Sequence, residues 1–222
     1  MNWTCKTLRN AAVLTLAMLI FAGCSFSSGN ADEEALKLAV PFTAQAPTDQ
    51  WESLPYSEAC EEAVLVMLDH FSSGEELTAE QADAEILKLV AWEEEHGYGI
   101  DLGAEDIAKV ADEFYDLDAK VYYDDDVTTE QIKAELDAGN PVVIPTAGTI
   151  LANPDYTAGG PPYHVIVLIG YNKTAFIAHD PGVTAGDSYK YSFATIEKAI
   201  HDWNGSKDTI MAGRKAMVVV EE

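Results

Sequence analysis

The side chain best suited to nucleophilic chemistry in this 222-residue chain is Cys60, near the start of a predicted helix. Ser57 is a good N-cap, and the apolar spacing after it predicts a helix over residues 57–71. In the first turn, unpaired N–H groups and the helix dipole favour a thiolate, whereas the adjacent Glu61 and Glu62 oppose it. Cys60 also continues an apolar stripe at helical spacing, so a simple core cysteine stays an alternative.

His164 is the histidine, among five, that is best placed to assist a thiol. It follows the segment Gly159-Gly160-Pro161-Pro162-Tyr163 and opens a predicted strand over residues 164–171. A position at the edge of a strand, beside a rigid loop, holds an imidazole firmly while leaving one side open. A thiol and an imidazole within hydrogen-bond reach form an activated nucleophile. A buried histidine with no chemical role is the alternative.

Asp180 is the candidate that would orient this imidazole. If the strands on either side of Asn172 close through a three-residue loop centred on that residue, His164 lies directly opposite Asp180. Opposed residues share a sheet face with Cβ atoms about 5 Å apart. Asp180 would then fix the tautomer of the imidazole, as a triad requires. A loop with an even number of residues would break this register, and Asp180-Pro181-Gly182 is also consistent with a plain turn.

The sequence predicts no metal or organic cofactor. Asp124-Asp125-Asp126 lacks the spacing and the glycine of a calcium loop. Neither the histidine and cysteine spacing of a zinc site nor a glycine-rich phosphate loop is found.

The N-terminal residues have the pattern of an export signal. Lys6 and Arg9 precede an apolar run over residues 11–22, which is too short to span a bilayer comfortably. The run ends in Ala22-Gly23-Cys24, which resembles the processing site of bacterial lipoproteins. We therefore expect a signal over residues 1–23, lipidation of Cys24, a tether over residues 24–37 and a folded domain over residues 38–222. The domain would face outside the cytoplasm on a membrane anchor; an ordinary cleaved signal or an uncleaved anchor are the alternatives.

Charge and cysteine content narrow the partners further. The net charge of −25 becomes −27 once a signal carrying Lys6 and Arg9 is removed. Such a surface repels nucleic acid and anionic headgroups, so we expect no nucleic-acid partner. With Cys5 in the signal and Cys24 lipidated, Cys60 is the only thiol of the domain, which excludes a disulfide framework.

The pattern of helices and strands indicates an α+β fold, because helices dominate the first half and strands the second. Capping boxes at Thr78 and Thr128 open two helices, and a strand over residues 119–123 separates the helical segments. The expected helices cover residues 57–71, 78–96, 104–115, 128–139 and 193–203. The other expected strands cover residues 142–146, 164–171, 174–179, 188–191 and 216–220. Residues 40–42 are expected to form a short strand or an extended entry.

Several short motifs, taken in order, resemble the peptidase C-39-like family, papain-like relatives of the bacteriocin double-glycine leader peptidases. The matching segments are Val40-Pro41-Phe42-Thr43-Ala44-Gln45-Ala46-Pro47, Trp51, Glu58-Ala59-Cys60-Glu61-Glu62-Ala63, Gly139-Asn140-Pro141-Val142, Tyr163-His164, Gly170-Tyr171 and His179-Asp180-Pro181-Gly182. The likeness extends from about Leu38 to Val220. Many relatives follow the cysteine with Gly-Pro, where this chain has Glu61-Glu62.

The resemblance implies a papain-like fold, with a helical lobe carrying Cys60 and an antiparallel sheet carrying His164 and Asp180. It also implies that Gln45 donates to the oxyanion, a contribution of about 3 kcal/mol in a well-studied case. The expected activity is that of a cysteine peptidase acting on peptides or proteins. A catalytically silent binding module of the same fold and an amidase acting on cell-wall peptides are the alternatives.

Overall fold

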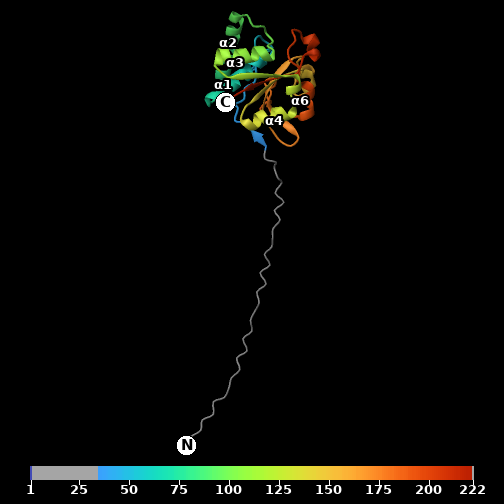
Figure 1. The fold of residues 1–222 in the computed structure, drawn as a ribbon. Coiled ribbons are helices and arrows are strands. Elements are labelled where there is room, and N and C mark those ends of the chain that lie inside the picture. The colour runs from blue at the N-terminus through green and yellow to red at the C-terminus, as the bar shows by residue number, and fades with distance from the viewer. Residues whose placement is uncertain (2–34, 222) are drawn as a thin grey trace. The chain divides into compact units, whose positions relative to one another are not determined.

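The computed structural model of the chain describes residue 1 and residues 35–221 (Figure 1). A seven-stranded antiparallel sheet has the order β2-β7-β3-β4-β5-β6, and β1 pairs with the end of β4 beyond β3. The strands are β1 (Leu36–Lys37), β2 (Ala119–Tyr123), β3 (Val142–Thr146), β4 (His164–Tyr171), β5 (Ala175–His179), β6 (Tyr189–Ser192) and β7 (Ala216–Val220). The fold is therefore α+β, as expected from the sequence.

Helices cover both faces of the sheet. They are α1 (Cys60–Ser73), α2 (Ala79–His96), α3 (Ala104–Tyr115), α4 (Thr129–Ala138), α5 (Gly148–Leu151) and α6 (Phe193–Ala199). The 3-10 turns are η1 (Asp124–Asp126), η2 (Thr157–Gly159) and η3 (Lys207–Ala212). In Figure 1, α1, α2 and α3 lie together on one side of the domain and α6 lies on the other. No helix in the described part is long and apolar enough to cross a membrane.

Alternate residues of the central strands enter two separate cores. Val165 and Val167 of β4 pack in one cluster with residues of α1 and α3. Ile166 and Leu168 pack in the other, with residues of α4 and α6. Because both faces are covered, β4 is buried from its first residue to Gly170, and a strand of this kind reads as a continuous apolar run.

Two expected boundaries differ from the structure. The first helix begins at Cys60 rather than Ser57, because turns closed by Ser57 and Glu58 N–H groups occupy the preceding residues. The last helix ends at Ala199, after which Ile200 forms a bridge with Thr146 of β3. The segment 40–42 is the extended entry that was expected as the alternative to a strand, and its Val40 carbonyl accepts from Nε2 of His179 at 2.9 Å.

The hairpin of β4 and β5 has a different register from the one expected. Tyr171 pairs with Phe176, so four residues lie between the last paired positions, and a four-residue connection alone would place His164 and Asp180 on opposite faces. A bulge between Leu168 and Gly170 adds one residue to β4, and Val167 then pairs with His179. The extra residue reverses the effect of the connection on which face each side chain occupies. Asp180 is consequently on the same face as His164, but diagonal to it rather than directly opposite.

Candidate active site

His164 and Asp180 are joined by a short hydrogen bond inside the protein. Nε2 of His164 lies 2.7 Å from Oδ1 of Asp180, and the two residues are 1% and 0% exposed. The carboxylate accepts, so Nε2 carries the proton and Nδ1 keeps a lone pair available for a neighbouring acid. The diagonal placement on one face of the hairpin thus brings together the pair that the sequence analysis predicted.

The carboxylate of Asp180 accepts four further hydrogen bonds. The backbone N–H of Gly182 donates to Oδ1 at 3.0 Å. Asn153, Tyr156 and Tyr191 donate to Oδ2 at 3.0, 2.7 and 2.5 Å. Burial raises the pKa of Asp180, but the His164 partner and the tyrosine donors outweigh it and hold that pKa below its usual range. Asp180 is therefore ionised, and its charge can stabilise an imidazolium.

Two glycines make room for the His164 ring. A Cβ on Gly182 would lie 2.8 Å from Cε1 of that ring, and a Cβ on Gly148 would lie 2.9 Å from the His164 Cβ. Tyr156 stands edge-on to the ring, with centroids 5.7 Å apart. The ring is thus held by a hydrogen bond at Nε2 and by close packing on several sides.

Cys60 is the first residue of α1 and is 6% exposed. Its Sγ donates to Oε2 of Glu61 at 2.8 Å and accepts a backbone hydrogen bond from Val165. The last pair of β4 and β5 joins Val167 to His179, so no residue of β5 lies opposite Val165. The N–H of Val165 is therefore available to the sulfur. The thiol therefore lies against the residue that follows His164 in β4.

The environment of Cys60 favours the thiol rather than the thiolate. Burial raises its pKa well above the usual value, and the charge and hydrogen bond of Glu61 raise it further, whereas the Val165 N–H lowers it. Of the two opposing effects weighed from the sequence, that of Glu61 prevails over that of the helix N-terminus in this geometry, because Glu61 turns back onto the sulfur. In the described part of the chain, the hydrogen bonds of the thiol are to Glu61 and Val165, not to the His164 ring.

Gln45 connects the segments that carry the other three residues. Its Nε2 donates to the Tyr56 carbonyl at 2.8 Å, four residues before Cys60. Its backbone N–H donates to the Pro181 carbonyl at 2.9 Å, directly after Asp180. All four predicted residues of the folded domain are thus buried and linked through neighbouring residues, whereas Cys24 lies outside the described residues.

The sequence analysis missed the residues that hold the charges of this site. Asn153, Tyr156 and Tyr191 come from loops and from β6, and their hydrogen bonds to Asp180 depend on tertiary contacts that a single sequence does not reveal. The sequence analysis considered Glu61 but did not predict that its side chain points into the protein. Glu61 is 1% exposed, and its Oε1 accepts from the Leu102 N–H at 2.9 Å. An acidic residue inside an otherwise apolar helix segment was the available signal.

A possible cation position lies elsewhere on α1 and α2. Ligand atoms of Asp69, His70 and Glu85 lie within 4.8 Å of one another among the described residues. Glu85 already binds Nε2 of His70 at 3.1 Å, and the positive charge of Lys88 acts on Asp69. These contacts connect α1 and α2 about 14 Å along α1 from Cys60 at the helical rise per residue.

Comparisons with known proteins agree with this architecture. The Peptidase_C39 like family matches residues 37–211. A crystal structure of a candidate C39-like peptidase from Bacillus anthracis superimposes with a TM-score of 0.56 at 19% identity, covering 86% of this chain and 99% of that one.

A second solved structure is more distant. It is a double glycine motif protease from an AMS/PCAT transporter in complex with the leader peptide, with a TM-score of 0.44 and 18% identity over 84% of this chain and 94% of that one. No curated protein matches the sequence. The family match covers most of the chain, and the first of these structures has the same fold. The chain therefore belongs to the Peptidase_C39 like family.

Proposed function

We propose that this protein is a cysteine peptidase in which Cys60 attacks the peptide carbonyl, His164 transfers the proton and Asp180 orients His164. The observation that supports this most directly is the buried 2.7 Å hydrogen bond between Nε2 of His164 and Oδ1 of Asp180. It fixes the tautomer in which Nδ1 can accept the proton of a thiol. Family and fold support the same reaction class.

The proposed reaction begins when the Cys60 side chain turns from Glu61 toward His164. Nδ1 of His164 takes the thiol proton, and the sulfur forms a bond to the carbonyl carbon of the substrate. The tetrahedral intermediate collapses as His164 gives the proton to the leaving amine, which leaves a thioester on Cys60. Water, deprotonated by His164, then releases the acid and restores the thiol. Gln45 Nε2 and the Cys60 backbone N–H are the proposed oxyanion donors.

One observation favours the silent binding module as a second candidate. The thiol donates to Glu61 and has a raised pKa, so the structure holds an unreactive form of the nucleophile. If no ligand shifts the thiol from Glu61 to His164, the same fold would bind peptides without cleaving them.

A peptide panel separates the two candidates. We expect the wild-type protein to cleave members of a mixed panel of unstructured peptides and cell-wall stem peptides, with a thioester on Cys60 detectable by mass spectrometry after acid quenching. Cys60→Ala and His164→Ala should abolish cleavage, and Asp180→Asn should reduce kcat by about 10²–10⁴-fold. Asp125→Asn, an exposed aspartate of η1, is the matched control. Absence of cleavage and of any thioester would leave the binding module as the function.

We further propose that the chain is exported and anchored through a lipid on Cys24, with the peptidase domain outside the cytoplasm. The support is the N-terminal pattern that ends in Ala22-Gly23-Cys24. Cys24→Ser should abolish incorporation of labelled fatty acid and move the protein from the membrane fraction to the soluble fraction. Membrane retention without change in that variant would exclude the lipid anchor.

A further inference from the structure

A cavity of about 270 Å³ lies beside the N-terminal turn of α1, on the helical side of the domain. Its lining comes from the loop that leads to Cys60, from α1, from the end of α2 and from the connection to α3. The lining residues are Leu54, Pro55, Glu58, Glu62, Val90, Glu93, Glu94, Tyr98, Gly99 and Ile100. The volume is at the small end of ligand sites, which suits one side chain rather than a cofactor.

The rim of this cavity is apolar and exposed. Leu54 is 68% exposed and Ile100 is 60% exposed, and both belong to the few large apolar side chains that the described part of the chain leaves in contact with solvent. Val90 and the Tyr98 ring continue the apolar wall inward. A ligand with an alkyl stem would bury these surfaces.

The inner end of the cavity carries two acidic side chains. Glu62 and Glu93 are the only buried lining residues, at 4% and 3% exposed. Burial raises the pKa of both carboxyl groups, that of Glu93 to about 7. Oε2 of Glu62 and Oε1 of Glu93 are buried and have no hydrogen-bond partner among the described residues. Buried acceptors without a donor are costly and rare.

A cationic donor would satisfy both carboxyl groups. An alkylammonium group has three N–H donors and no acceptor, so it can serve oxygens that converge from two helices. Lys207, which contacts the lining residue Glu58, does not do so, because its Nζ pairs with Glu58 at 2.6 Å and with Asp101 at 3.2 Å. The net charge of −25 also attracts cations to the surface.

We propose that this cavity binds the primary ammonium group of a lysine side chain, with the alkyl stem against Leu54, Val90 and Ile100 and the ammonium between Glu62 and Glu93. Glu62 lies in the same turn of α1 as Cys60 but on a different face of the helix, so a lysine-containing peptide held here would lie against the helix that carries the proposed nucleophile; this last step rests on the proposed peptidase function. Binding of the ammonium itself does not depend on turnover.

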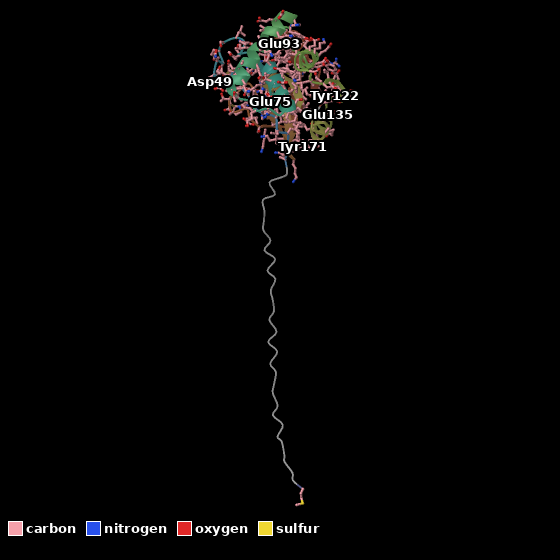
Figure 2. All side chains as sticks on the ribbon, turned by 90° about the vertical axis from the view of Figure 1, so that its left-hand side faces the viewer. Asp49, Glu75, Glu93, Tyr122, Glu135 and Tyr171 are labelled. Atoms are coloured by element: carbon pink, nitrogen blue, oxygen red, sulfur yellow. The ribbon has the colours of Figure 1, made fainter. Side chains whose placement is uncertain are left out.

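The test uses n-butylammonium, which reproduces the lysine stem and cannot be hydrolysed. We expect it to shift the methyl resonances of Leu54 and Ile100 in the full-length protein and to bind at least tenfold more tightly than 1-butanol. Glu62→Gln and Glu93→Gln should each weaken binding at least tenfold, since Gln keeps the shape and removes the charge. Glu75→Gln, an exposed acid that Figure 2 shows apart from Glu93, should leave binding unchanged.

Three results would overturn the proposal: no shift at either methyl group, equal affinity for 1-butanol, or wild-type affinity in both Gln variants. The methyl shifts in the wild-type protein need no variant, so instability of a variant cannot hide a negative result. A protein that binds butylammonium but cleaves no peptide would refute the peptidase proposal and leave this site standing.

Discussion

Asp180 is the most heavily hydrogen-bonded side chain of the candidate site. Five donors fix both of its oxygens, and the carboxylate stays ionised although it is fully buried. Because five donors fix the carboxylate, it holds the His164 ring that it binds in one orientation, and Nδ1 faces a constant direction. Preorganisation of this kind lets a base act without reorganisation at the moment of reaction.

Glu61 acts in the opposite sense on the nucleophile. Burial raises the pKa of the thiol, and Glu61 against the sulfur raises it further, because ionising both groups would place two negative charges in contact; burial raises the pKa of Glu61 as well. The Cys60–Glu61 hydrogen bond therefore defines a resting form that a substrate must displace before catalysis. In an exported protein, such a form would also protect a lone thiol from oxidation.

Glu61→Gln should release this restraint on Cys60. We expect the pH midpoint of iodoacetamide labelling to lie above the free-cysteine value of about 8.5 in the wild type and to fall in the variant. Mass spectrometry of the Cys60 peptide reports this thiol separately from Cys5 and Cys24. Glu75→Gln is the matched control and should label as the wild type does. A wild-type midpoint below 8.5 would show that Cys60 is bonded to His164 in solution rather than to Glu61.

The β4–β5 hairpin shows where sequence reasoning was sufficient and where it was not. Apolar runs and caps predicted α2, α3, β2, β3 and β7 well, because these elements follow from local patterns. The pairing of His164 with Asp180 was predicted from an odd-numbered loop, whereas the chain uses a four-residue connection and a bulge. The face is the same because the two differences cancel. Neither is visible in the sequence, since bulges depend on how the strand packs.

Gly182 also controls the position of His164, because a residue without a side chain lets the turn after β5 close against the His164 ring. In Gly182→Ala the new methyl group would meet Cε1 and Nε2 of His164 at 2.8 and 2.9 Å. The ring is the movable partner, so we expect it to leave Asp180, with a loss of at least tenfold in kcat and little change in Tm.

Gly74→Ala provides the control for that variant. Gly74 caps α1 with φ of 69°, and an added Cβ there meets no atom within 4 Å. It should therefore lower the Tm through backbone strain and leave the activity intact. If Gly182→Ala kept full kcat, the position of the His164 ring would not control the reaction.

At the scale of the whole domain, the sheet is covered on both faces, and the acidic groups divide into two classes. Most are exposed and make the protein strongly negative, as the composition indicated. Glu61, Glu62 and Glu93 are instead buried, as are Asp180 and Asp202. Helical spacing could not distinguish Glu61 and Glu62, because α1 is buried almost all round, whereas Glu93 continues the buried positions Ala82, Ile86 and Leu89 of α2. The buried acids are the ones that link stability to pH.

Glu93 should make the domain less stable as the pH rises from about 5 to 8. Its pKa is raised by burial to about 7, so the folded protein holds more protons than the unfolded chain between about pH 4.3 and 7, and stability falls as the pH rises through that window. Asp180 acts in the opposite sense: its lowered pKa gives stability that is present above about pH 3.9 and is lost in stronger acid.

Urea unfolding of the wild type and of Glu93→Gln at a series of pH values measures how much Glu93 contributes to the pH dependence of the free energy of unfolding. The variant has no carboxyl group to ionise at that position, so it should lose about 3 kcal/mol less than the wild type between pH 5 and 8, from a pKa shift of about 2.5. Glu75→Gln removes the same charge from the surface and should follow the wild-type curve. Parallel curves for all three proteins would mean that the Glu62–Glu93 pair reaches water in solution. The cavity beside α1 would then offer no desolvated acid to an ammonium group, so this measurement also bears on the proposed lysine site.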